Sequence, residues 1–241
     1  AVVNFDSTKS RLRIDAHYTN RSNRNGGISF TVRAPAHTSV RLNTPGGDVV
    51  LSGLSGEFSG KTMGGEILLR ELEGMVSLET MGGDIDVESS TLEGAVKTMG
   101  GEISVQLTGG NLNATTMGGD VEYINRGDVS SSLVSIETKG GAIAARGSLS
   151  VVNARTMGGN IRIRSASGFA SVDTMGGNID IDEIEGGITA ATMGGDIKGR
   201  VISGSRDRLD GRNEVTMRTR GGDIVRRVPD AYSMHVETEH N

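Results

Sequence analysis

The chain has 241 residues, a formal net charge of −5 and 3% aromatic residues, with 37 glycines and only 3 prolines. This composition excludes an ordinary two-layer globular domain with an aromatic core, and glycine without a three-residue period excludes collagen. The chain has no cysteine, which excludes a disulfide framework and a thiolate metal site.

Residues 1–43 precede the regular part of the chain and are predicted to form N-terminal cap strands. Alternating stretches at Ile28-Ser29-Phe30-Thr31-Val32 and Ser39-Val40-Arg41-Leu42 are typical of strands, and a repeat rod needs caps that protect its terminal edges. The first residues, Ala1-Val2-Val3-Asn4, do not resemble a signal peptide, and no run of 18 apolar residues occurs in the chain. We therefore expect no transmembrane segment.

Residues 44–227 contain ten copies of the pattern Thr-x-Gly-Gly, and such a fixed period decides the architecture. Seven copies read Thr-Met-Gly-Gly, whereas Pro45, Lys139 and Arg220 replace methionine in the other three. Successive threonines are 18 residues apart, except for one spacing of 22 and one of 27. The repeat threonines are Thr44, Thr62, Thr80, Thr98, Thr116, Thr138, Thr156, Thr174, Thr192 and Thr219.

Each repeat is predicted to form two short strands and two corners. Counting the threonine as position 1, position 6 is isoleucine or valine in every copy, position 8 is usually apolar, and positions 15 and 17 are apolar too, as in Val76 and Leu78. This period-two alternation predicts a single-domain, all-β, parallel β-solenoid (β-helix), expected to be right-handed, with the position 6 side chains buried.

Each glycine pair is predicted to be a structural corner. Glycine allows the positive φ of a sharp turn, and a Cβ at these positions would collide with the neighbouring coil. The corner glycines of the seven complete copies are Gly64, Gly65, Gly82, Gly83, Gly100, Gly101, Gly118, Gly119, Gly158, Gly159, Gly176, Gly177, Gly194 and Gly195.

The two long spacings and the end of the chain depart from the repeat. The insertions fall near Arg126–Ser132 and Ser203–Arg212, and the second is a polar loop that leaves the rod. Residues 228–241 are predicted to form a C-terminal strand and a tail. The three segments 1–43, 44–227 and 228–241 are expected to make one structural domain.

The repeated Thr-x-Gly-Gly-Asp-Ile-x-Val pattern, with Val32-Arg33-Ala34-Pro35-Ala36 ahead of its first copy, resembles a bacterial family of β-strand-repeat proteins that are classed as candidate adhesins. The resemblance covers about residues 28–227. It implies a β-solenoid exported to the cell envelope, hence an extracytoplasmic location in the periplasm, at the cell surface or outside the cell. It implies no catalytic residues. Methionine at position 2 departs from the common pattern of that family.

Position 5 forms a column of acids and amides, which suggests two interpretations. Calcium could relieve the repulsion between stacked carboxylates, but Asn160, Asn178 and Ala142 stand where calcium would need acids. Alternatively, the side chains accept hydrogen bonds from corner amides, as in Asx turns. We expect the second arrangement, and no metal ion or other cofactor.

The threonine and methionine columns each have a functional and a structural interpretation. Regular hydroxyls could order ice, but that arrangement wants two exposed threonine columns, so we expect inward or corner hydroxyls bonded to their neighbours. The methionines could line a copper path because thioethers are soft ligands. Since no histidine accompanies them, we expect them to pack in corner gaps. The methionines are Met63, Met81, Met99, Met117, Met157, Met175 and Met193.

The sequence does not predict an enzyme. His17, His37, His235 and His240 all lie in the flanks, and neither a Ser-His-Asp order nor a phosphate loop is present. A polysaccharide-acting β-helix enzyme would need an acid pair hidden among the carboxylate columns. We predict instead a non-enzymatic surface adhesin or scaffold, with that enzyme or a self-assembling structural rod as alternatives.

Charge is distributed unevenly along the chain. Residues 44–137 hold 15 acidic and 4 basic residues, whereas residues 198–227 hold 9 basic and 4 acidic residues, and residues 9–41 hold 7 basic and 1 acidic. Such asymmetry could promote head-to-tail self-association or binding to an anionic surface polysaccharide or a matrix protein. Nucleic acid is not expected as a partner because the net charge is negative and aromatics are scarce.

Overall fold

A computed structural model of the chain describes residues 2–8, 11–17, 29–126, 133–202, 214–227 and 233–238. The chain divides into two compact units, Ala1–Ala34 and Pro35–Asn241. In the first unit, β1 (Val2–Thr8) pairs with β2 (Arg11–His17) as an antiparallel hairpin. The strand expected near Phe30 is not formed at residues 29–32, where Phe30 and Val32 are exposed, so their alternation has no core to pack against. Ile28 lies outside the described residues.

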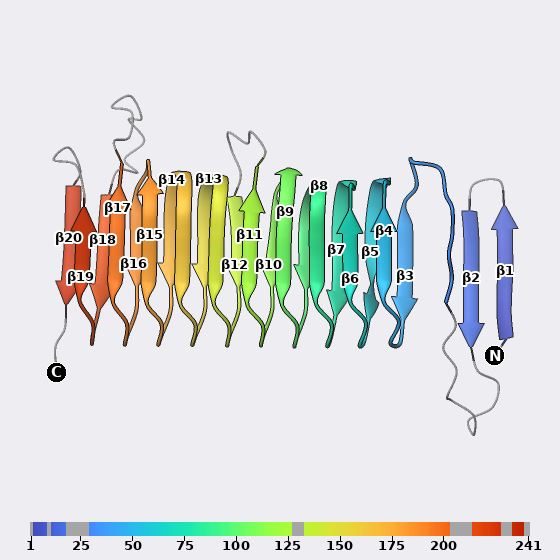
Figure 1. The fold of residues 1–241 in the computed structure, drawn as a ribbon, viewed down its shortest axis with the longest axis horizontal. Helices are drawn as coiled ribbons and strands as arrows, with labels where there is room; N and C mark the ends of the chain where they lie inside the picture. Colours follow the sequence, from blue (N-terminus) through green and yellow to red (C-terminus); the bar gives the residue numbers. More distant parts are fainter. Residues whose placement is uncertain are drawn as a thin grey trace, which may run out of the picture. The chain divides into compact units, whose positions relative to one another are not determined.

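The second unit is a parallel β-solenoid, which confirms the predicted fold (Figure 1). Strand residues pair with their equivalents one repeat away, apart from register shifts in a few strand pairs: Ile85, for example, lies between Ile67 and Ile103. Two parallel sheets result. We call the sheet of strands that follow the glycine pairs the Gly-Gly sheet, and the sheet of strands that lead to the repeat threonines the Thr sheet.

The Gly-Gly sheet consists of β4 (Val49–Ser52), β6 (Ile67–Arg70), β8 (Ile85–Lys97), β9 (Ile103–Gly109), β11 (Val121–Asn125), β13 (Ile143–Arg155), β14 (Ile161–Asp173), β15 (Ile179–Ile184), β17 (Ile197–Val201) and β19 (Ile224–Arg227). The Thr sheet consists of β3 (Val40–Thr44), β5 (Ser55–Thr62), β7 (Glu73–Thr80), β10 (Leu112–Thr115), β12 (Leu133–Glu137), β16 (Ile188–Ala191), β18 (Glu214–Thr219) and β20 (Ser233–Thr238). The long strands β8, β13 and β14 contribute to both sheets, so the chain passes from one to the other without a break in these coils.

The first and last strands of the solenoid include residues of the predicted N-terminal cap and C-terminal tail segments. β3 contains most of the predicted Ser39–Leu42 stretch, and it pairs with β5 as an ordinary solenoid strand. At the other end, β20 supplies the expected C-terminal strand and pairs with β18. Most of the insertions at 126–132 and 203–212 lie outside the described residues.

A thin apolar core fills the space between the two sheets. The position 6 side chains are buried as predicted, except that Ile224 in the terminal coil is only partly buried. Positions 15 and 17 meet them from the Thr sheet, and no aromatic core is required because the sheets are close enough for aliphatic chains to fill the gap. Tyr123 is a buried exception. Its hydroxyl oxygen accepts a 3.3 Å hydrogen bond from the N–H of Leu112, and burial raises its pKa to about 12.

The glycine pairs do not use positive φ, which corrects part of the corner prediction. Among the described glycines, positive φ occurs elsewhere, and none of the paired glycines adopts it. The second glycine of the pair is required by close approach instead. A Cβ on Gly83 would lie 2.1 Å from the carbonyl oxygen of Gly65, whereas a Cβ on Gly82 would meet nothing closer than 3.8 Å.

Positive φ recurs at the opposite corner, at position 10 of the repeat, and also occurs at Gly56, Gly60, Gly74, Gly94 and Gly110. Two copies place Gly53 and Gly147 there, but Glu71 has φ 53° and Ser89 has φ 49° at the same position. Ser165 and Glu183 repeat this conformation. Left-handed backbone is unfavourable for residues with a side chain, so this corner, and not the Gly-Gly corner, stores backbone strain.

The repeat threonines lie inside the rod and link adjacent coils. In the described repeats from Thr62 to Thr219 the threonine is buried. The hydroxyl of Thr98 donates to the carbonyl oxygen of Gly83 at 2.8 Å and accepts from the N–H of Gly101 at 3.2 Å. The expectation of inward, bonded hydroxyls is confirmed, and these threonines present no exposed hydroxyl column that could order ice.

Candidate charged binding surface

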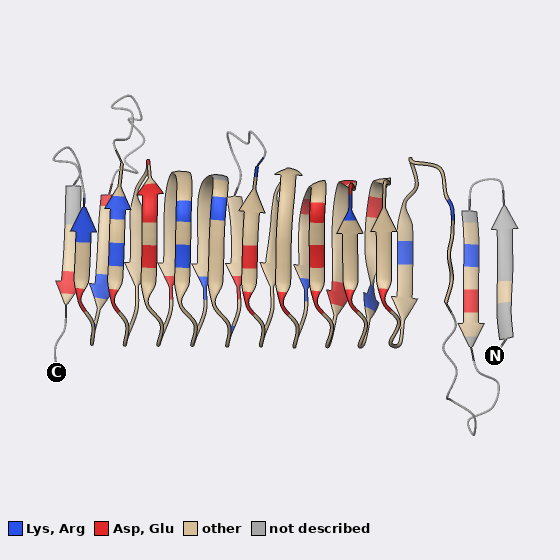
Figure 2. Cartoon of the chain, viewed as in Figure 1, with Lys and Arg blue, Asp and Glu red and all other residues tan. Residues whose placement is uncertain are grey.

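The outer face of the Gly-Gly sheet separates its charges into two patches. Along this sheet, positions 7 and 9 point outward because positions 6 and 8 are buried. The acidic patch consists of Asp84, Asp86, Glu88, Glu102, Asp120 and Glu122. The basic patch consists of Arg146, Arg162, Arg164, Lys198, Arg200 and Arg227. Figure 2 shows the red and blue bands on successive coils, with the acids of β15 set between two groups of basic residues.

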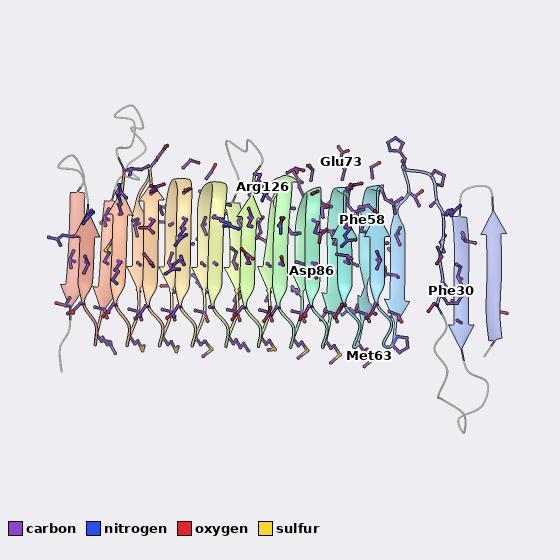
Figure 3. All side chains as sticks on the ribbon, in the orientation of Figure 1. Phe30, Phe58, Met63, Glu73, Asp86 and Arg126 are labelled. Atoms are coloured by element: carbon purple, nitrogen blue, oxygen red, sulfur yellow. The ribbon has the colours of Figure 1, made fainter. Side chains whose placement is uncertain are left out.

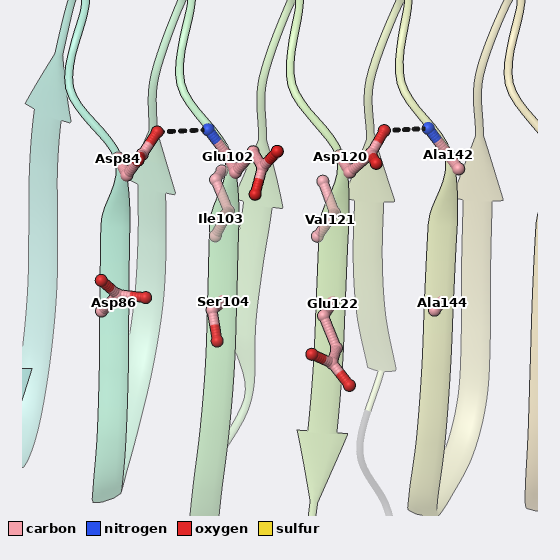
Figure 4. Close-up of a pocket in the computed structure, with 10 residues that line it drawn as sticks. All are labelled: Asp84, Asp86, Glu102, Ile103, Ser104, Asp120, Val121, Glu122, Ala142 and Ala144. Atoms are coloured by element: carbon pink, nitrogen blue, oxygen red, sulfur yellow. Dashed lines mark hydrogen bonds between the residues drawn. The ribbon is translucent and has the colours of Figure 1, made fainter.

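A hollow of about 360 Å³ lies within the acidic patch. It spans β8, β9, β11 and β13, and Asp86, Ser104, Glu122 and Ala144 stand side by side across it at position 7 (Figure 4). The short side chains of Ser104 and Ala144 alternate with the longer carboxylates, which leaves space at the surface. The hollow is therefore produced by side-chain length on a regular backbone.

Two carboxylates of the hollow hold the next coil. Asp84 Oδ1 accepts a 2.8 Å hydrogen bond from the N–H of Glu102, and Asp120 Oδ1 accepts a 2.7 Å hydrogen bond from the N–H of Ala142 (Figure 4). The same bond recurs from Asp48, Asn160, Asn178 and Asp196. The predicted bonding of position 5 to corner amides is confirmed, but the bond joins neighbouring coils and is not an Asx turn within one coil.

The remaining acids of the hollow differ in their surroundings. Glu122 forms a 3.3 Å ion pair with Arg146, which links the acidic patch to the basic patch. Asp86 is partly buried, and this desolvation, with the nearby charges of Asp84 and Glu88, raises its pKa although Arg70 opposes the effect. Burial and neighbouring acids thus make ionisation of Asp86 less favourable than in water.

The basic patch contains like charges in direct register. Arg146 pairs in register with Arg164, and Arg200 pairs in register with Arg227 in the next coil. Only part of this charge is compensated nearby, as in the 3.2 Å contact of Arg162 with Asp180. Stacked like charges repel, so an anionic ligand laid across these coils would relieve the repulsion.

The outer face of the Thr sheet is different. Its position 18 column alternates in sign, and Lys61–Glu79, Arg155–Asp173 and Arg218–Glu237 form ion pairs of 2.6, 3.4 and 2.9 Å between adjacent coils. The charges of this column are therefore paired across adjacent coils, whereas like charges adjoin on the Gly-Gly sheet, as Arg146 and Arg164 do.

The methionines do not fill corner gaps, so the packing expectation is wrong. The seven side chains of the repeated Thr-Met-Gly-Gly corner are 40–58% exposed. The alternation of the Thr sheet explains this. Positions 15, 17 and 1 point inward, as Val76, Leu78 and Thr80 show, so position 2 points outward. Continuing the inward-outward alternation of positions 15, 17 and 1 by one residue, to position 2, would have predicted that the methionines are exposed.

The described histidines do not assemble a site. His37 contacts Ser55 beside the first coil, and His235 lies 3.0 Å from Glu237 on β20 in the last coil. The side chains of His17 and His240 lie outside the described residues. In the described part of the chain, no group of three or more His, Cys, Asp or Glu side chains is arranged to hold a metal ion.

The remaining observations concern membrane-spanning helices and similarity to known proteins. Within the described residues, no helix has the length and apolar character needed to cross a membrane. Comparison of the chain with protein-family models, with curated proteins and with solved structures gave no match.

Proposed function

We propose that the chain is a non-enzymatic adhesin or scaffold protein of the bacterial envelope, whose Gly-Gly sheet binds charged polymers or charged protein surfaces. The observation that supports this most directly is the pair of patches on one regular sheet. Their charged groups recur on neighbouring coils, about 4.8 Å apart, with the acids of β15 interrupting the basic patch. A linear polymer with repeated charges could contact several coils at once. The resemblance to envelope β-strand-repeat proteins supports the extracytoplasmic location.

Anionic polysaccharide is the partner class that the basic patch favours. Arg146, Arg162 and Arg164 lie on adjacent coils of one face, and guanidinium groups bind carboxylate and phosphate groups in bidentate geometry. Binding at such a surface should weaken as salt increases because exposed charges are screened. A matrix protein with an acidic surface would use the same residues.

Binding to immobilised alginate and polygalacturonate, with neutral dextran as reference, tests the proposal. The double change Arg162→Glu/Arg164→Glu should abolish retention on the anionic polymers at low salt. Arg155→Glu/Arg218→Glu is the matched control, because it makes the same charge change on the Thr sheet, where Arg155 pairs with Asp173 and Arg218 with Glu237. Equal loss in both variants, or no retention on any anionic polymer or acidic matrix protein, would contradict the proposal.

The acidic hollow favours a polysaccharide-acting enzyme as a second candidate. A carboxyl with a raised pKa, such as Asp86, is what a general acid requires, and Glu122 lies two coils away as a second carboxyl. However, Asp84 and Asp120 are committed to backbone amides and Glu122 to Arg146. Incubation with pectin, alginate, chitin and peptidoglycan fragments distinguishes the two: turnover that Asp86→Asn abolishes would establish the enzyme.

A further inference from the structure

The seven exposed methionines form a column along one edge of the solenoid. Figure 3 shows a row of sulfur atoms at the turns where the chain leaves the Thr sheet, with Met63 labelled. We call Met63, Met81, Met99 and Met117 the first run, and Met157, Met175 and Met193 the second run. Lys139 occupies the equivalent position between them.

Neither packing nor simple duplication accounts for these methionines. The fold accepts Pro45, Lys139 and Arg220 at the same corner, so the corner itself does not need methionine. The outward positions of the strands have diverged. Position 7, for example, reads Val50, Leu68, Asp86, Ser104, Glu122, Ala144, Arg162, Asp180, Lys198 and Val225. Position 2 has kept methionine, an exposed apolar side chain, in seven coils.

The backbone holds these side chains at a fixed spacing. The carbonyl oxygens of Met81 and Met157 accept 3.1 Å hydrogen bonds from the N–H groups of Gly100 and Gly176 in the next coil. Neighbouring methionines thus start about one strand spacing, 4.8 Å, apart. Each side chain has three rotatable bonds, so two or three adjacent sulfur atoms can converge on one ion placed between them.

The electrostatic setting favours a cation, particularly at the first run. Three residues beyond each of its methionines stands an acid of the position 5 column: Glu66, Asp84, Glu102 and Asp120. In the second run the same position holds Asn160 and Asn178 beyond Met157 and Met175, and a single acid, Asp196, beyond Met193. The ammonium group of Lys139 separates the runs and repels a cation at its own coil.

We propose that the two methionine runs bind soft monovalent cations through thioethers of adjacent coils, and that Cu(I) is the natural ligand. Thioether sulfur is a soft ligand that selects Cu(I) over hard divalent ions. Each run should hold at least one ion, and the first run should bind more tightly than the second because carboxylates accompany it. The proposal is independent of polymer binding by the Gly-Gly sheet.

Titration with Ag(I), a redox-inert analogue, and with Cu(I) kept reduced by ascorbate under nitrogen tests the site. The ε-methyl signals of the seven methionines, labelled with carbon-13, should shift in NMR spectra, those of the first run at lower ion concentration. Met75 is an internal control, because it is 59% exposed but lies on the Thr sheet between Glu57 and Glu93. The signal of the buried Met217 should also stay in place.

Variants localise the effect. Met81→Leu/Met99→Leu keeps the apolar volume and should weaken binding at the first run by at least about tenfold, the free-energy equivalent of about 1.4 kcal/mol, without affecting the second run. Met75→Leu should bind as the unaltered chain does. Unshifted methyl signals in both runs, an equal shift of Met75, or unchanged affinity in the double variant would overturn the site. Methyl signals that respond only to dimerisation, and not to the ions, would assign the column to a protein contact.

Discussion

The hydroxyl of Thr80 donates a 2.9 Å hydrogen bond to the carbonyl oxygen of Gly65 in the preceding coil. The same hydroxyl accepts a 3.2 Å hydrogen bond from the N–H of Gly83 in its own coil. Because Thr80 is fully buried, neither backbone group can turn to water if the hydroxyl is lost. The side chain therefore completes the corner and joins two coils at once.

Thr80→Val removes this hydroxyl and keeps the shape of the side chain. We expect the free energy of unfolding to fall by about 2 kcal/mol, because a buried N–H and a buried C=O lose their partner. Thr80→Ser keeps the hydroxyl and removes only a methyl group, which should cost about 1 kcal/mol. Equilibrium unfolding in urea compares the two. A serine variant that is less stable than the valine variant would contradict the role of the hydroxyl.

The two glycines of one corner should respond very differently to alanine. A Cβ on Gly83 would overlap the backbone of the preceding coil, with the oxygen of Gly65 at 2.1 Å, whereas Gly82 has only ordinary contacts. Gly83→Ala should cost more than about 3 kcal/mol, since coils must separate to admit the methyl group. Gly82→Ala should stay within about 0.5 kcal/mol. Thermal and urea unfolding of the pair measures this, and similar losses in both would show that stacking distance is not the constraint.

The periodic part of the fold could be predicted from sequence because each column repeats one environment many times. Position 6 and the threonine column show this, because each position occurs in ten copies of the repeat and indicates the same environment each time. The corners were less predictable. Glycine at Gly82-Gly83 suggested positive φ, but the left-handed residues are Glu71, Ser89 and their equivalents. Gly53 and Gly147 at the same position were the available signal.

Only part of the candidate site could be predicted from the sequence. Uneven charge along the chain could be counted, but its collection on one sheet depends on which strand positions face outward. The hollow depends on a further detail, the alternation of Asp86 and Glu122 with Ser104 and Ala144 across neighbouring coils. The hydrophobic character of methionine predicts burial, but the alternation of inward residues that ends at Thr80 places the next residue, Met81, on the outside.

Glu71→Gly should stabilise the protein, although glycine usually weakens a β structure. Glu71 is exposed and has φ 53°, and relief of this left-handed strain should gain about 1 kcal/mol. Glu73 is the control, because it is exposed, lies in β7 two residues later (Figure 3) and does not have positive φ. Glu73→Gly should cost about 0.5–1 kcal/mol. If both variants lose stability equally in urea unfolding, the conformation of this corner is wrong.

Calcium should not stabilise the solenoid. The position 5 oxygens of Asp84, Asp120 and Asn160 already accept hydrogen bonds from the next coil. A ligand that binds only the folded state raises the midpoint of thermal unfolding by mass action. We expect the same midpoint in excess EDTA and in millimolar calcium, with magnesium as a control for ionic strength. A large upward shift specific to calcium would place an ion in this column.

The pH dependence of stability should report the environment of Asp86. Its pKa is raised in the folded protein, first by burial and then by Asp84 and Glu88, so the folded state binds this proton more tightly than the unfolded state. The contribution is therefore most favourable below the unfolded pKa and is lost as the pH rises through the folded pKa.

Asp86→Asn should stabilise the chain at pH 7, by less than about 1 kcal/mol because the carboxyl is partly exposed and screened. At pH 3 the variant and the unaltered chain should have equal stability. Unfolding curves at both pH values decide the matter: a variant that is less stable at pH 7 would mean that the ionised carboxylate is held by a favourable partner, and the acidic hollow would have to be reassigned.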